Sequence, residues 1–229
     1  MDQQSKQGPG QGHGKRKKDD EAAAGGNGAS NGHDDFPADL AASAKAAFEA
    51  EKQSVEKGID AWKKLVASNQ TAWAPRRELA RVYKKAERWN AFIEVMKEAV
   101  DKASWSSPED KIPILREMIE VYRDRLKLDV MVVNAFTQIL NIQPTNFEAA
   151  DELAAQYETM KRWPDLISLL RKKASVVEAP AEKVALQLRI ANLFIEKFSN
   201  QAEAIKAFEA ILEIDPENAD ALGFVKQMY

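Results

Sequence analysis

The chain has 229 residues, of which 45% are hydrophobic and 30% are charged, and its formal net charge is −3 with an isoelectric point near 5.6. This charge argues against a general polyanion-binding protein, and the absence of cysteine excludes disulfides, thiolate metal sites and cysteine nucleophiles. Because the sequence has neither an apolar run of about 18 residues nor the apolar core of a signal peptide, we expect a cytoplasmic protein without a membrane span.

Residues 1–37 differ in composition from the rest of the chain. They hold eight of the ten glycines and almost no large apolar side chain before Phe36. Such a segment buries too little surface to offset the entropy of ordering it, so we expect a disordered low-complexity tail before a folded domain over 38–229. The basic run Lys15–Lys18 is either an anion-binding or targeting patch or part of a solvated linker. The acidic run Asp19–Glu21 favours the linker, because it cancels most of that charge.

Both histidines, His13 and His33, lie in this tail, so the folded part has no imidazole and no thiol. It therefore has no Ser–His or Cys–His pair and no imidazole or thiolate metal ligand. No glycine-rich phosphate loop follows a strand. The sequence predicts a protein that is not an enzyme and that needs no cofactor and no metal.

Helical patterns begin after the tail, over 39–51 and 58–70. They form either a first pair of helices or one long N-terminal capping helix, and the sequence leaves both open. Further along, "SSPED" is typical of a helix start, with Ser107 as the N-cap and Pro108 at the first helical position. Trp105, just before it, either fills a gap between adjacent repeats or anchors a partner.

From residue 79 onward the sequence repeats itself. Aromatic residues recur at spacings of 39, 35, 37 and 35, each four residues after a large apolar residue, so that the two share one face of a helix. The aromatic positions are Tyr83, Tyr122, Tyr157, Phe194 and Tyr229, and the apolar positions are Leu79, Met118, Leu153, Ile190 and Val225. A large apolar residue follows each of the first four aromatic positions by 13 or 14 residues, and these residues are Met96, Phe136, Leu170 and Phe208. A bundle core also produces such a stripe, but recurrence over five cycles favours a repeat array.

The pattern resembles the tetratricopeptide repeat (TPR), a helix–turn–helix unit of about 34 residues. The best match is "AIKAFEAILEIDPENA", in which Ala204, Phe208 and Pro216 take the second-helix and terminal-proline positions. In the 58–70 helix, Gly58 and Trp62 take the small and large positions. The family's tryptophan position is never Trp here, and the repeats carry one to five extra residues.

The resemblance covers roughly residues 40–229, and the chain is similar to the long multi-repeat TPR proteins of bacteria. It implies an all-α fold, a right-handed α-solenoid of about four to five TPR-like helix–turn–helix repeats after the disordered tail. Because the chain stops at Tyr229 within an apolar helix, we expect a fragment of a longer array with its last repeat truncated.

Members of the family usually bind proteins or peptides in a concave groove lined by the first helices, and the resemblance implies such a scaffold or adaptor here. Counted from the aromatic positions, this groove is basic in the first repeat and acidic in the third, so a partner with an acidic and a basic segment would dock in one direction. The expected groove residues are Arg77, Arg81, Lys84, Arg116, Arg123, Asp151, Glu158 and Asn192. The competing interpretation is that these charges only keep a helix face soluble.

The family's carboxylate clamp is not expected, because Glu148 and Glu152 stand where it needs cations. A helical-repeat RNA-binding protein is the alternative function, although the acidic chain and the change of charge along the groove argue against nucleic acid. The chain could also be the interaction part of a longer multidomain protein. The sequence does not indicate the partner or the oligomeric state.

Overall fold

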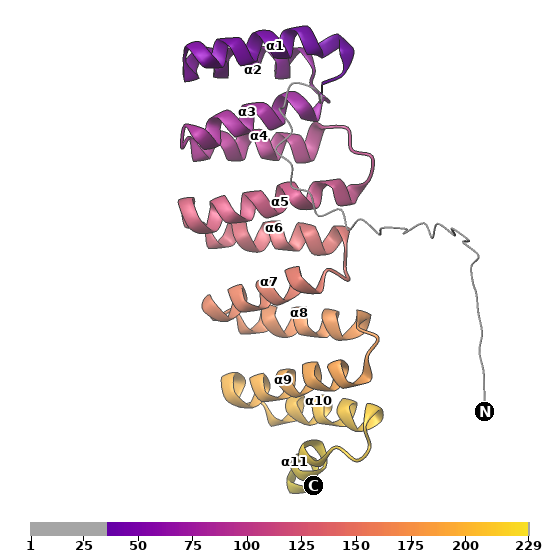
Figure 1. Cartoon of the computed structure of the whole chain (residues 1–229). Helices are drawn as coiled ribbons and strands as arrows, with labels where there is room; N and C mark the ends of the chain where they lie inside the picture. The colour runs from indigo at the N-terminus through magenta and orange to yellow at the C-terminus, as the bar shows by residue number, and fades with distance from the viewer. Residues whose placement is uncertain (1–35, 229) are drawn as a thin grey trace, which may run out of the picture.

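The computed structural model describes residues 36–228, and these form a stack of antiparallel helix pairs (Figure 1). Within them lie eleven α-helices and no strand. The helices are α1 (Ala38–Gln53), α2 (Val55–Ser68), α3 (Trp73–Lys85), α4 (Trp89–Lys102), α5 (Ile112–Glu120), α6 (Asp129–Ile142), α7 (Phe147–Thr159), α8 (Trp163–Val176), α9 (Pro180–Phe198), α10 (Gln201–Ile214) and α11 (Ala219–Met228). A 3₁₀ turn, η1 (Pro108–Lys111), precedes α5, and a π-helical segment, η2 (Val121–Leu126), continues it.

The expected disordered tail, with the Lys15–Lys18 run and both histidines, falls on residues 1–35, outside the described residues, as does Tyr229. The first described residue, Phe36, is buried and stacks on Trp62 with ring centroids 5.7 Å apart. Phe36 therefore packs against the helical array.

The N-terminal patterns form two helices and not one long capping helix. The break is Ser54, whose extended backbone ends α1 and whose hydroxyl oxygen accepts a hydrogen bond from the N–H of Lys57 in the first turn of α2. The two helices approach closely at Gly58, where an added Cβ would lie 2.9 Å from the Cα of Glu51. Trp62 is completely buried between them. The small and large positions expected in this pair are thus confirmed.

The repeat register correctly predicted most of the core. Among the positions singled out, Leu79, Tyr83, Leu153, Tyr157, Ile190 and Phe208 are all buried. Phe194 is an exception, because its ring is only half-buried at the edge of α9, against Phe198 and beneath Arg171 of α8. Its neighbour Leu193 takes the buried place.

Each clear repeat turns from its first to its second helix through a non-glycine residue with positive φ. These residues are Glu87, Lys127, Lys161 and Ser199. The N–H that follows each of them returns to the carbonyl of the aromatic position, for example Arg88 to Tyr83 at 2.9 Å. This geometry satisfies a carbonyl that the helix end leaves free. The aromatic spacing is therefore tied to the backbone turn as well as to the core.

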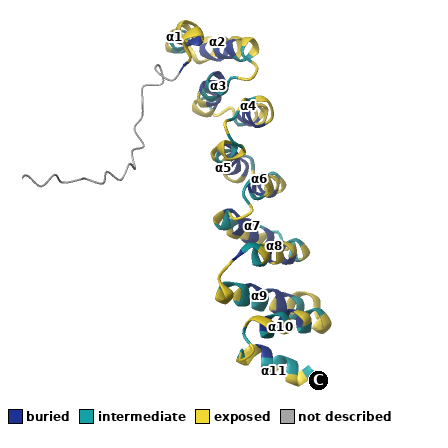
Figure 2. Cartoon of the chain, turned by 90° about the vertical axis from the view of Figure 1, so that its right-hand side faces the viewer, coloured by how far each residue is buried: buried dark blue, intermediate teal, exposed yellow. Residues whose placement is uncertain are grey.

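Successive pairs stack into one elongated solenoid of TPR-like helix–turn–helix repeats. Figure 2 shows that from α1 to α8 the odd-numbered helices lie on one side and the even-numbered helices on the other. Among the described residues, no helix has the length and apolar character needed to cross a membrane. We call the exposed surface of α3, α5, α7 and α9 the odd-helix face.

Candidate functional site

The structure places all eight expected groove residues on the odd-numbered helices or on η2, and leaves none of them buried. They belong to a set of twelve equivalent positions, six and two residues before and one residue after each aromatic position. We call this set the stripe: Arg77, Arg81 and Lys84, then Arg116, Glu120 and Arg123, then Asp151, Ala155 and Glu158, then Leu188, Asn192 and Ile195. The stripe changes from cationic to mixed, then to acidic, then to largely apolar.

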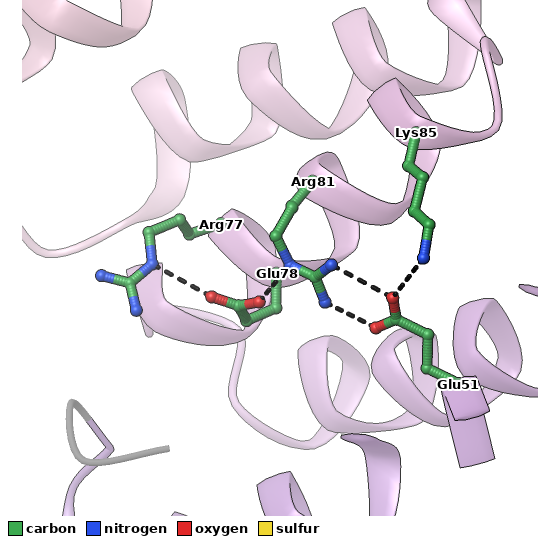
Figure 3. Close-up of polar contacts among 5 residues, drawn as sticks. All are labelled: Glu51, Arg77, Glu78, Arg81 and Lys85. Carbon is green, nitrogen blue, oxygen red and sulfur yellow. Dashed lines mark hydrogen bonds and ion pairs between the residues drawn. The ribbon is translucent and has the colours of Figure 1, made fainter. Parts of the chain in front are cut away.

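At its N-terminal end, the stripe joins a cluster of charges between α1 and α3 (Figure 3). The Arg81 guanidinium donates to both carboxylate oxygens of Glu51, at 3.1 and 2.5 Å, and through Nε to Glu78 at 2.6 Å. Arg77 donates to Glu78, and the Lys85 ammonium lies 3.7 Å from Glu51. The cluster fixes the first odd-numbered helix against the second.

Two opposing effects act on Glu51 in this cluster. Partial burial raises the pKa of its carboxyl, but the hydrogen bond and charge of Arg81, together with Lys85, outweigh burial and hold the pKa below its ordinary value. For Arg81, the hydrogen bond to Glu51 raises the pKa and outweighs desolvation. Both groups are therefore held in their charged forms.

The middle of the stripe is crossed by further ion pairs between successive odd-numbered helices. Lys84 of α3 lies 2.6 Å from Glu117 of α5. Arg116 of α5 reaches two carboxylates of α7, Glu148 at 2.8 Å and Glu152 at 2.9 Å. The cations expected to meet a partner are thus already opposite carboxylates of the neighbouring repeat.

The acidic part of the stripe is paired in the same way. Asp151 of α7 lies 2.7 Å from Lys173 of α8, and Glu158 lies 2.6 Å from Arg189 of α9. Every junction between odd-numbered helices from α1 to α9 is therefore bridged by at least one ion pair. Such partly exposed pairs contribute little stability one by one, but they fix the side chains they join.

The last part of the stripe forms a hollow instead of ion pairs. Leu188, Asn192 and Ile195 of α9 line a pocket of about 410 Å³ that α10 and α11 complete. The other lining residues are Phe208, Asp220, Phe224 and Gln227. The Phe208 and Phe224 rings stack with centroids 4.4 Å apart. The hollow combines apolar walls with two side-chain amides, the composition typical of a binding pocket.

Sequence reasoning found only part of this pocket. It placed Asn192 in the groove, but it missed Asp220 and Phe224. Their contribution depends on how α11 packs against α9 and α10, which no local pattern reports. The only sequence signal for these pocket residues was the apolar character of the last helix, which was interpreted as the mark of a truncated repeat.

Trp105 has structural contacts of its own. Its ring lies 5.4 Å from that of Trp73 in α3, and its indole N–H donates to the carbonyl of Ala99 in α4 at 3.1 Å. Both contacts lie within one repeat, and the side chain is half-buried. Ser107 begins η1 as expected, with its N–H donating to the Asp110 carboxylate at 2.9 Å. Trp105 therefore holds the α4–α5 connection against its own repeat.

Among residues 36–228, no group of three or more His, Cys, Asp or Glu is placed to hold a metal ion.

No protein-family model matches the sequence, and no curated protein does. Among solved structures, the chain is similar to YrrB, described as a TPR protein with an unusual peptide-binding site, at 12% identity and a TM-score of 0.39 over 79% of this chain and 88% of that one. It is also similar to MamA, at 18% identity and a TM-score of 0.38 over 74% of this chain and 94% of that one. A structure of Naa15/Naa10 bound to HypK-THB gives 14% identity and a TM-score of 0.49, over 81% of this chain and 33% of that one.

Proposed function

We propose that the solenoid is an interaction scaffold or adaptor that binds an extended segment of a partner protein along its odd-helix face. The observation that carries this proposal is the pocket of about 410 Å³ formed by Leu188, Asn192 and Ile195 with α10 and α11. Three of its residues occupy stripe positions of the fourth repeat. At the same positions, the other three repeats carry mainly charged residues, and most of these form ion pairs. The pocket is thus the part of the stripe with polar and apolar groups available to a ligand.

The chemistry of the pocket suits a peptide. The walls formed by Leu188, Ile195 and Phe224 can cover one apolar side chain of the partner. The amides of Asn192 and Gln227 each carry donors and an acceptor, the groups that pair with a peptide backbone. No reaction is required of any of these residues, so the proposed role is binding alone.

The rest of the stripe would set the direction in which the partner lies. Helix α3 carries five cations and one carboxylate, whereas α7 carries four carboxylates and no cation. The α7 carboxylates all face cations of neighbouring helices, among them Arg116, Lys173 and Arg189. Because cations outnumber carboxylates within α3, we propose that an acidic part of the partner lies along this helix.

A role in RNA binding fits this face less well. Phosphate recognition along a solenoid needs a continuous run of positive charge. The four carboxylates of α7 interrupt such a run in the middle of the array.

Selection from a library of random dodecapeptides displayed on phage tests the proposal, with the full chain as bait. Leu188→Arg puts a charge into the pocket, and Val130→Arg is the matched control, because Val130 of α6 is 57% exposed and lies outside the pocket. We expect peptides that bind the original chain and the control but lose binding to Leu188→Arg. Recovery of no such peptide, or only of peptides that bind all three proteins equally, would contradict the proposal.

A further inference from the structure

The corner between α10 and α11 carries a concentration of negative charge beside the pocket. Residues 207–228 contain five carboxylates and a single cation, Lys226. Four of the carboxylates lie close together in the sequence at this corner: Glu213, Asp215, Glu217 and Asp220. Within the described part of the chain, none of these four forms an ion pair, and Asp215 only accepts a hydrogen bond from the Asn218 amide at 3.1 Å.

This corner differs from the charged part of the odd-helix face. There, carboxylates such as Glu117, Asp151 and Glu158 each lie within 2.7 Å of a lysine or arginine nitrogen. At the corner, the charge is left unbalanced, and one of its members, Asp220, lines the pocket. The negatively charged corner therefore borders the pocket lined by Leu188, Asn192 and Ile195.

We infer that the pocket takes a large apolar side chain from a peptide segment that also carries a lysine or arginine beside it. This inference rests on the proposed function and adds the chemistry of the partner. The apolar side chain lies between Leu188 and the Phe208–Phe224 stack, where aromatic rings offer a large contact area. The neighbouring cation lies against Asp220.

Electrostatics at the corner favours a cation over the alternatives. A partner carboxylate in the pocket would lie beside Asp220, which forms no ion pair among the described residues, and like charges brought together weaken binding. A partner cation in the pocket is attracted most by Asp220, which lines it, because charges farther away than about 8 Å are largely screened at physiological salt. Association should accordingly slow as salt is raised.

The test uses the peptides selected on the full chain and three variants of it. Asp220→Lys reverses the charge at the pocket, Asp220→Asn removes it, and Asp60→Lys is the control, reversing an exposed carboxylate of α2 that forms no ion pair among the described residues. Affinities are measured by fluorescence polarisation of the labelled peptides, and circular dichroism melting checks that each variant folds. If Asp220→Lys fails to fold, Asp220→Asn carries the comparison.

Peptides that depend on Leu188 should be enriched in Lys or Arg within two residues of a large apolar residue. They should bind Asp220→Asn about two- to fivefold more weakly and Asp220→Lys more weakly still, and Asp60→Lys without change. Selection on Asp220→Lys should enrich acidic neighbours instead. Leu188-dependent peptides with neutral or acidic neighbours, or with affinities unchanged by Asp220→Lys, would overturn this inference and leave the proposed function standing. Peptides independent of Leu188 would overturn both.

Discussion

At the scale of single residues, the turns inside the repeats hold side chains in an unfavourable backbone conformation. Glu87, Lys127, Lys161 and Ser199 have φ between 49° and 55° at the same point of four successive repeats. A side chain with a Cβ pays roughly 1–2 kcal/mol for this left-handed region, whereas glycine occupies it without clash. The sequence signal usually used to locate such turns, a glycine after the helix, is therefore missing here.

Replacing one of these residues by glycine should stabilise the protein. We expect Lys161→Gly to raise the free energy of unfolding by about 0.5–1 kcal/mol, because relief of the left-handed strain exceeds the entropy that glycine adds to the unfolded chain. Urea denaturation followed by circular dichroism measures the change. Lys161→Ala keeps the Cβ and serves as the control. An equal gain from both variants would show that removal of the lysine side chain, and not relief of backbone strain, is responsible.

The charge of Glu51 makes stability depend on pH. Because its pKa is lower in the folded protein than the ordinary 4.5, the carboxylate stabilises the fold above that pH, and the contribution is lost as the pH falls through the folded pKa. Wild type should therefore lose stability relative to Glu51→Gln when the pH is lowered from 5 towards 3. Urea denaturation across this range measures both proteins. Parallel loss of stability by wild type and Glu51→Gln would show that the Arg81 pair contributes nothing.

At the scale of the helical elements, the turns inside the repeats alternate between a shorter and a longer form, and a contact between neighbouring repeats accompanies this alternation. Trp89 and Trp163 open the second helices of the first and third clear repeats, each six residues after its tyrosine. The Arg125 guanidinium lies 5.0 Å from the Trp89 ring centroid, and the Lys197 ammonium lies 5.1 Å from that of Trp163. Each cation comes from the following repeat, which has the longer turn. The alternation in turn length thus coincides with a cation–π contact between neighbouring repeats.

The two helical glycines provide a matched pair of substitutions. Gly58→Ala should lower the free energy of unfolding by about 1–3 kcal/mol, because the new Cβ would lie 2.9 Å from the Cα of Glu51 and force α1 away from α2. Gly223→Ala in α11 meets nothing within 4 Å and should raise helix stability by up to about 1 kcal/mol. Thermal unfolding of both variants measures the difference. A stabilising effect of Gly58→Ala would mean that the two helices are not in close contact there.

At the scale of the whole molecule, the sequence predicted what depends on local periodicity and missed what depends on stacking. Leu79 and Tyr83 share one face of a helix, so their burial follows from a spacing of four residues. The pairing of Arg116 with Glu148 joins residues 32 apart in sequence, and only the distance between successive repeats brings them together. The pocket at Asp220 likewise depends on stacking, because its lining residues come from α9, α10 and α11. Phe194 was expected in the core, but its ring is only half-buried, whereas Tyr122, at the same position before an equally long turn, is buried.

The ion pairs along the odd-helix face also couple the repeats to one another, and Arg116 provides the sharpest test of that coupling. Stability in a solenoid is a sum of repeat terms and interface terms, so weakening one interface should divide the array there. Arg116→Glu places a carboxylate opposite Glu148 and Glu152 of α7. We expect a loss of about 1 kcal/mol, with hydrogen exchange speeding up in α7–α10 more than in α1–α4.

Reversal of the partner carboxylate Glu148 provides the control for this prediction. Glu148→Arg restores an opposite charge in the Arg116→Glu background, leaves Glu152 beside Arg123 at 3.8 Å, and should recover most of the lost protection. Uniform exchange along all helices in Arg116→Glu would instead show that the array unfolds as one cooperative unit. Because Arg81 and Arg116 join repeats, reversing them in a binding experiment would weaken the scaffold together with any partner site. Substitutions at Leu188 and Asp220, which form no ion pairs among the described residues, separate the two effects.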